Sequence, residues 1–84
     1  MVRVKLFANF REVAGVRELE IDANTIEEVL KKLVEIFPRL EEYFKGEKLR
    51  SYVHVMVNGE IVRDFKFELN NSDVVAIFPP VSGG

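Results

Sequence analysis

Two segments that are expected to form apolar strands lie at opposite ends of this sequence, and they constrain the fold more than any other feature. Residues 2–8 alternate in polarity, so that Val2, Val4 and Leu6 share one face of a strand. Residues 74–78 are wholly apolar, which is typical of a strand buried on both faces or carrying a docking surface on one. Because one domain of 84 residues has room for one sheet, both segments compete for its centre, and we expect them side by side.

The main helix is predicted between these strands, over residues 25–37. Thr25 and Glu28 have the spacing of a capping box with Thr25 as the N-cap, and Pro38 is expected to end the helix. Apolar residues recur at spacings of three and four, and they predict one buried stripe: Val29, Leu30, Leu33, Ile36 and Phe37.

The elements before and after this helix are predicted to be short. Residues 9–15 are expected to form a turn, with one helical turn in it, that Gly15 closes, and residues 16–21 a strand with one wet face. After the main helix, a second short helical turn is expected to end at Gly46, and it is built on Leu40, Tyr43 and Phe44.

A hairpin is predicted in the second half of the chain. Residues 52–57 form its first strand, Asn58-Gly59 has the composition of a tight turn, and a short strand begins at Glu60. Residues 63–73 are expected to be irregular, with Phe67 and Leu69 as anchors and a turn at residues 70–73. The whole pattern predicts an α+β fold of the β-grasp (ubiquitin-like) type, in which a mixed sheet packs on one main helix. We expect a β-grasp domain over residues 1–78 and an extended diglycine tail over residues 79–84.

Composition argues against several kinds of built-in chemistry. The chain has no cysteine, which removes disulfides, thiolate metal sites and Cys–His nucleophilic pairs, and its one histidine, His54, lacks the partners that a metal site needs. We therefore expect no metal and no cofactor bound by this chain, and we interpret His54 as a structural or solvent-edge residue. The net charge is −2 without a basic block, so a nucleic-acid partner is not expected. No apolar run suits a membrane span, and the alternating N-terminal residues do not resemble a signal peptide, so the expected location is the cytoplasm.

The segment that follows the last predicted strand is the unusual part of the sequence, since it reads FPPVSGG over residues 78–84. Two prolines favour an extended chain, and six residues from position 79 onward can reach up to about 20 Å. The final glycines have no Cβ and can enter a narrow channel in a partner. The residues expected to contact a partner in this way are Pro79, Pro80, Val81, Ser82 and Gly83, with the carboxyl group of Gly84 as the reactive end.

Ordering such a tail costs conformational entropy, so an apolar docking patch is expected near its base. Phe7 and Phe78 point away from the faces that contain Leu6 and Ile77. They are expected on the uncovered face of the sheet, and Ile61 is a further candidate for the same patch.

These residues resemble a known family. Residues 74–84, VVAIFPPVSGG, closely resemble the C-terminus of the small subunits of molybdopterin synthase, which are ubiquitin-like sulfur carriers. The start of the chain, VRVKLFA over residues 2–8, also fits, as do Arg11-Glu12, Gly15 and Val57-Asn58-Gly59. The resemblance covers essentially the whole chain, and its specific part is the Phe-Pro-Pro segment followed by the diglycine.

The resemblance implies a mechanism. An ATP-dependent activating enzyme adenylates the carboxylate of Gly84, and sulfur then replaces one oxygen to give a thiocarboxylate. The tail enters the large subunit of the synthase, in a heterotetramer, and donates sulfur to a pterin precursor of the molybdenum or tungsten cofactor. Family interface positions match Phe7, Ile61 and Phe78. On this reading the chain is not an enzyme on its own, and ATP is used by the activating partner.

Three alternatives stay open. The chain is also similar to sulfur carriers of thiamine or tRNA pathways, and to archaeal ubiquitin-like modifiers that are joined to lysines through a terminal glycine such as Gly84. A third interpretation is a β-grasp binding module whose tail is inert.

Overall fold

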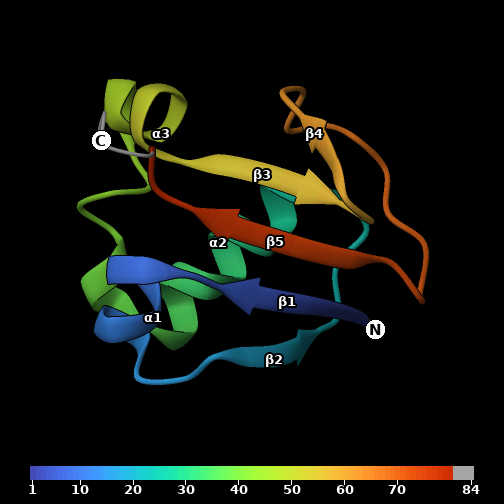
Figure 1. Cartoon of the computed structure of the whole chain (residues 1–84), viewed down its shortest axis with the longest axis horizontal. Coiled ribbons are helices and arrows are strands. Elements are labelled where there is room, and N and C mark those ends of the chain that lie inside the picture. Colours follow the sequence, from blue (N-terminus) through green and yellow to red (C-terminus); the bar gives the residue numbers. More distant parts are fainter. Residues whose placement is uncertain (81–84) are drawn as a thin grey trace.

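A computed structural model describes residues 1–80 of the chain, apart from the side chains of Glu47, Lys48 and Arg50. It contains a five-stranded sheet in the order β2-β1-β5-β3-β4. The strands are β1 (Val2–Leu6), β2 (Glu18–Ile21), β3 (His54–Val57), β4 (Glu60–Val62) and β5 (Val74–Phe78). β1 and β5 pair in parallel, and all other neighbours are antiparallel, so the sheet is mixed as expected (Figure 1).

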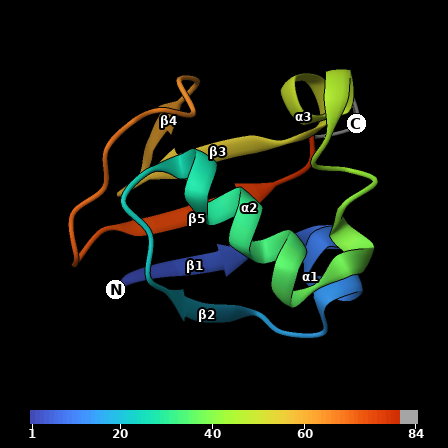
Figure 2. The same cartoon turned by 180° about the vertical axis from the view of Figure 1, so that it is seen from behind.

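One helix, α2 (Ile26–Ile36), covers one face of this sheet (Figure 2). Strand alternation turns Val4, Val55, Val75 and Ile77 toward α2, and none of the four is more than 1% exposed. The fold is therefore the predicted β-grasp arrangement, and the two strands from opposite ends of the chain lie side by side at its centre.

Hydrogen bonds at the N-terminal end of α2 explain how the irregular segment after β4 is ordered. The Thr25 side chain accepts a hydrogen bond from the Glu28 N–H at 3.2 Å, which confirms the N-cap. The Glu28 carboxylate accepts from the N–H of Asn24 at 3.0 Å, one residue before the cap. The next two free helix N–H groups, of Ile26 and Glu27, donate to the carbonyls of Phe67 and Phe65 at 3.2 and 2.7 Å.

Two predicted core positions are wrong. Ile36 is 51% exposed, because it lies at the margin of the apolar stripe on the last turn of α2, whereas Ile26 is fully buried at the other end of the helix. Phe67 is 41% exposed, since its segment is held through its backbone carbonyl; Phe65 packs against the core instead, and Leu69 is buried as predicted.

The segments around β1 and β3 also differ from the prediction. β1 ends at Leu6 because Ala8, with φ 53°, turns the chain into a seven-residue helix, α1 (Ala8–Ala14). Gly15, at φ 80°, closes this helix as expected. β2 begins at Glu18, two residues later than predicted.

The second short helix is arranged differently as well. Pro38–Leu40 form a 3-10 turn, η1, and Gly46 begins the helix α3 (Gly46–Tyr52) rather than ending one. β3 therefore starts at His54 and not at residue 52. An aromatic cluster joins α1, the segment between η1 and α3, and the end of α3. In it the buried ring of Phe10 makes edge contacts with Tyr43, Phe44 and Tyr52, at centroid distances of 5.3 to 6.3 Å.

The predicted turn at Asn58-Gly59 joins β3 to β4, and a polar cluster ties it to the start of β5. Asn58 and Gly59 both have positive φ, 51° and 87°, as this kind of turn requires. The Asn58 side chain accepts from the N–H of Val74 and donates to the carboxylate of Asp73, both at 2.9 Å. The other Asp73 oxygen accepts from the N–H of Asn70 at 2.8 Å. The hydrogen bonds from Asn70 and then from Asn58 lower the pKa of the buried Asp73 carboxyl group below its ordinary value.

We expect Asp73→Asn to lower the free energy of unfolding by about 1–2 kcal/mol at pH 7, because the ionised acceptor of two hydrogen bonds is lost. Since the pKa of Asp73 is lower in the folded than in the unfolded protein, its contribution is complete above the unfolded pKa of about 4 and is lost as pH falls through the folded pKa. Urea unfolding at pH 7 and at several values below pH 4 should therefore show a difference between the two proteins that shrinks with acid. Glu60→Gln, at an exposed position in the same hairpin, is the control. A difference that is the same at every pH would contradict this role of the carboxylate.

Candidate functional site

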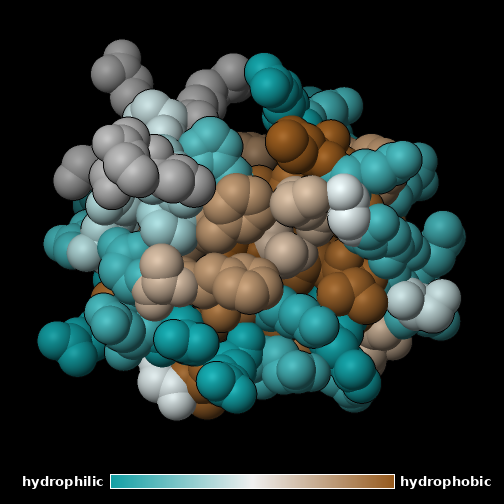
Figure 3. Space-filling view, in the orientation of Figure 1, coloured by the Kyte–Doolittle hydropathy of each residue, from teal (hydrophilic) through white to brown (hydrophobic). Residues whose placement is uncertain are grey.

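The face of the sheet opposite α2 carries no helix, and it presents a band of apolar side chains. Because Val75 and Ile77 turn inward, Val74, Ala76 and Phe78 of β5 turn outward. Figure 3 shows the resulting apolar surface across the middle of this open face. Such a patch on a small domain is typical of a partner surface.

The three apolar residues that the sequence suggested for docking lie on this face. Phe7 is 43% exposed, Ile61 is 62% exposed and Phe78 is half-buried. Phe7 and Phe78 are neighbours, because Leu6 pairs with Ile77 and the Phe7 N–H donates to the Ile77 carbonyl at 3.1 Å. Ile61 lies at the other margin of the face, on β4.

Two residues that sequence reasoning left out, Met56 and Ala76, connect these positions. Met56 of β3 pairs with Ile61 on one side and with Ala76 on the other, so the apolar surface is continuous from β4 to β5. The alternation of residues 53, 55 and 57, all buried valines, was the available signal, since it puts Met56 on the open face. We use the term apolar band for these residues: Phe7, Met56, Ile61, Ala76 and Phe78.

His54 extends the apolar band at the end where β5 stops. It is the cross-strand partner of Phe78, and the two rings stack at a centroid distance of 5.9 Å and an interplanar angle of 22°. Its side chain is exposed, in keeping with a solvent-edge position, and it adds an aromatic surface beside Phe78.

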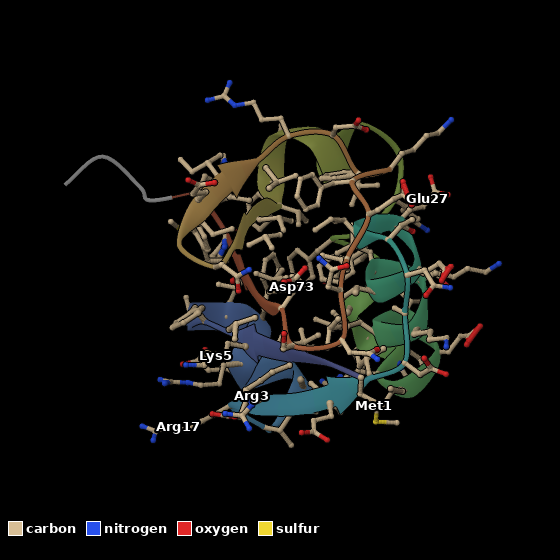
Figure 4. All side chains as sticks on the ribbon, turned by 90° about the vertical axis from the view of Figure 1, so that its right-hand side faces the viewer. Met1, Arg3, Lys5, Arg17, Glu27 and Asp73 are labelled. Carbon is tan, nitrogen blue, oxygen red and sulfur yellow. The ribbon has the colours of Figure 1, made fainter. Side chains whose placement is uncertain are left out.

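Charged residues border the apolar band on the side of β1 and β2. Arg3 and Lys5 pair across the strands with Glu20 and Glu18, and the Arg3 guanidinium lies 3.4 Å from the Glu18 carboxylate. Arg3, Lys5 and Arg17 project from the same side of the molecule (Figure 4). These exposed pairs contribute little to stability, so they mainly limit the apolar area on this side.

The tail begins at this face. β5 ends at Phe78, and Pro79 is half-buried while Pro80 is exposed. A proline has no N–H to donate, so the sheet cannot continue through both positions. The remaining predicted contact residues, Val81, Ser82 and Gly83, and the predicted reactive residue Gly84, lie outside the described residues.

Other chemistry has little support in the described part of the chain. The described side chains do not bring three His, Asp or Glu residues together in a way that could hold a metal ion. Tyr43, whose pKa is raised chiefly by its hydrogen bond to the Glu42 carboxylate, belongs to the aromatic cluster around Phe10. Across the same residues, no helix is long and apolar enough to cross a bilayer. The arrangement that stands out is therefore an apolar face beside the base of a proline-led tail.

Comparison with known proteins agrees with this geometry. The model of the ThiS family matches residues 4–84. A small archaeal modifier protein 1 of Haloferax volcanii is 38% identical over 85 residues, which covers 95% of this chain and 97% of that protein. A molybdopterin synthase sulfur carrier subunit of Arabidopsis thaliana is 37% identical over 86 residues, covering 99% of this chain and 82% of that protein.

A solved structure shows the same fold in a complex. A chain in the crystal structure of the Amycolatopsis orientalis BexX/CysO complex superposes with a TM-score of 0.86 at 25% identity, and each chain is covered completely. That neighbour was crystallised together with a second protein, as its description states.

Exposure on the open face leads to a stability prediction. We expect Ile61→Ala to change the free energy of unfolding by no more than about 0.5 kcal/mol, because the side chain is 62% exposed. Ile77→Ala is the matched variant on the buried face and should cost about 2–5 kcal/mol, since Ile77 is fully buried. Urea unfolding of both variants measures the difference. A large cost at Ile61 would mean that this residue serves the fold and not a partner.

Proposed function

Because this chain belongs to the ThiS family of ubiquitin-like sulfur carriers, we propose that it carries sulfur as a thiocarboxylate on Gly84. We propose further that it donates this sulfur to a pterin precursor in molybdopterin biosynthesis. The observation that carries the proposal is the course of the chain from the apolar band directly into Pro79-Pro80 and on to the sequence of Gly83-Gly84. The names of curated relatives support the molybdopterin pathway in particular.

The chemistry needs a partner at each step. A carboxylate resists nucleophiles, so it is first converted to an acyl adenylate with release of pyrophosphate. A sulfur nucleophile then displaces AMP, and the product is an anionic thiocarboxylate that is nucleophilic through sulfur, as a thiolate is. No Gly-rich phosphate loop of the usual spacing occurs in this sequence, so ATP belongs to an adenylating partner, and acids and bases belong to the proteins that receive the tail.

The apolar band has a defined role in this scheme. The tail of residues 79–84 delivers the reactive group, while the domain of residues 1–78 docks on the partner through Phe7, Ile61 and Phe78. The proposed partners are the activating enzyme and the large subunit of molybdopterin synthase, with which the chain forms a heterotetramer. The chain on its own turns over no substrate and binds no cofactor.

A second candidate function is conjugation to lysines through Gly84. The similarity to a small archaeal modifier protein favours it, since the identity of 38% is close to the 37% of the sulfur carrier subunit from Arabidopsis thaliana. Both functions start with the same adenylate and differ in the nucleophile that follows, sulfur or a lysine amine. Proteomic detection of diglycine remnants on lysines in the source organism would support conjugation.

The proposed chemistry at Gly84 can be tested by mass. Incubation with the activating enzyme, ATP and a sulfur donor should raise the mass of the intact chain by one oxygen-to-sulfur exchange, and adding the large subunit and the pterin precursor should reverse it. Deletion of Gly84 should abolish the exchange, whereas Ile36→Ala, on the opposite side of the sheet, should leave it unchanged. An unchanged mass, under conditions that thiolate a known carrier, would overturn the proposal.

Docking through the apolar band can be tested separately from the chemistry. Ile61→Asp should weaken binding to the large subunit at least tenfold, because it puts a charge into the apolar contact, and this corresponds to about 1.4 kcal/mol or more. Ile36→Asp is the matched control, since Ile36 is an isoleucine of similar exposure at the end of α2. Isothermal titration calorimetry measures both affinities. Equal affinities for the two variants would place the docking surface elsewhere.

A further inference from the structure

A groove on the helix side of the molecule has no role in the proposed function. It has a volume of about 360 Å³, and its lining comes largely from α2 and from the segment between η1 and α3. Figure 2 shows the course of these elements behind the sheet. Its floor is apolar and comes from four separate parts of the chain: Leu30, Val34, Phe44, Leu49 and Phe65.

The floor of this groove is incompletely covered. Leu30 and Phe44 are buried, but Val34, Leu49 and Phe65 are only half-buried although they pack against the core. Their remaining apolar surface lies in one concave site, where a ligand side chain would remove it from water.

The groove has a length that suits a helix. Its residues on α2 span positions 27 to 35, and eight residue steps correspond to about 12 Å along the helix axis. A ligand helix of about two turns has the same length and presents anchors at positions i, i+3 or i+4, and i+7. At Phe65 the groove adjoins a larger cleft of about 740 Å³, which reaches His54 and Ile61 at the margin of the open face. The wall of this cleft carries charges of both signs, from Arg63, Asp64 and Lys66. The part of the groove with an apolar floor and a mainly acidic rim therefore ends at Phe65.

Among the described side chains, the rim is predominantly acidic, since Glu27, Glu35 and Glu41 line the groove together with the cationic Lys31. The Glu41 carboxylate also lies 3.6 Å from the Lys45 ammonium group. Both side chains are more than 60% exposed, and because such a surface ion pair contributes little free energy, Glu41 can pair with a cation of a ligand instead.

We propose that this groove binds a short amphipathic helix of a second protein, with apolar anchors in the floor and Lys or Arg side chains beside the three carboxylates. The inference goes beyond sulfur transfer, because it involves neither the tail nor the open face. None of the residues that line the groove belongs to the apolar band, so the two proposed contacts use different side chains.

The test uses the full chain and a synthetic helical peptide with leucines at i, i+4 and i+7 and lysines on either side of them. In NMR titrations of the isotope-labelled protein, the largest shift changes should fall on Leu30, Val34, Phe44, Leu49 and Phe65, and added salt should weaken the affinity. A peptide with glutamates in place of the lysines should bind at least tenfold more weakly. Val34→Asp should weaken binding of the lysine peptide at least tenfold, and Ile36→Asp, two residues further along α2, should not.

A second variant guards against misfolding of the first. Replacing Glu27, Glu35 and Glu41 together by glutamine keeps the shape of the rim, and it should weaken binding and flatten the salt dependence. The proposal is overturned if no shifts occur in the groove at millimolar peptide, if the shifts map to the apolar band, or if both peptides bind equally. It is also overturned if the groove is occupied by a second copy of the chain without any peptide. None of these readouts depends on Gly84, so a failure here is distinct from a failure of the sulfur-carrier proposal.

Discussion

The parallel pairing of β1 with β5 is the interaction on which the rest of this structure depends. It joins two segments that are separated by most of the chain, and it buries Val4 and Ile77 against α2. It also fixes the position of two residues of the apolar band, because Phe7, directly after β1, and Phe78, the last residue of β5, emerge on the open face at the same end of the sheet. A slip of one residue in this register would exchange the inward and outward side chains of β5 and remove both the core and the apolar band.

The features that the sequence predicted are those encoded by neighbouring residues. Four such features each define their own geometry: the alternation in residues 53–57, the Asn58-Gly59 turn, the Thr25 cap and the wholly apolar β5. Together they were sufficient to predict the β-grasp topology. On the open face, the same alternation places Phe7, Ile61 and Phe78 where docking was expected. The role proposed for the residues after Pro80 rests on their sequence, on the chemistry of a terminal carboxylate and on relatives.

The features that the sequence did not predict depend on contacts between distant segments. One helical turn was expected within residues 9–15, but the full length of α1 and the place of α3 were not predicted, because both helices are short and no periodic pattern is long enough to identify them. What holds them is the ring of Phe10, which meets Tyr43 and Tyr52 from two later segments. Phe67 was assigned to the core because it is large and apolar, but the backbone carbonyls of its segment are needed to cap α2, and this leaves its ring outside. Gly46 has the positive φ that ends many helices, yet here it is the first residue of one.

The energetics of the tail explain why a carrier of this kind needs a folded body. Ordering six residues costs on the order of 6–12 kcal/mol, and the two prolines reduce that cost because their φ is already fixed. At about 25 cal/mol for each Å² of apolar surface buried, roughly 400 Å² of contact is needed to offset about 10 kcal/mol. The last glycines contribute almost no apolar surface of their own, and in the proposed function the apolar band around Phe7, Ile61 and Phe78 supplies contact that they lack. The proposal thus divides affinity and chemistry between two ends of one path along β5, with the open face selecting the protein that is bound and the tip carrying the group that reacts.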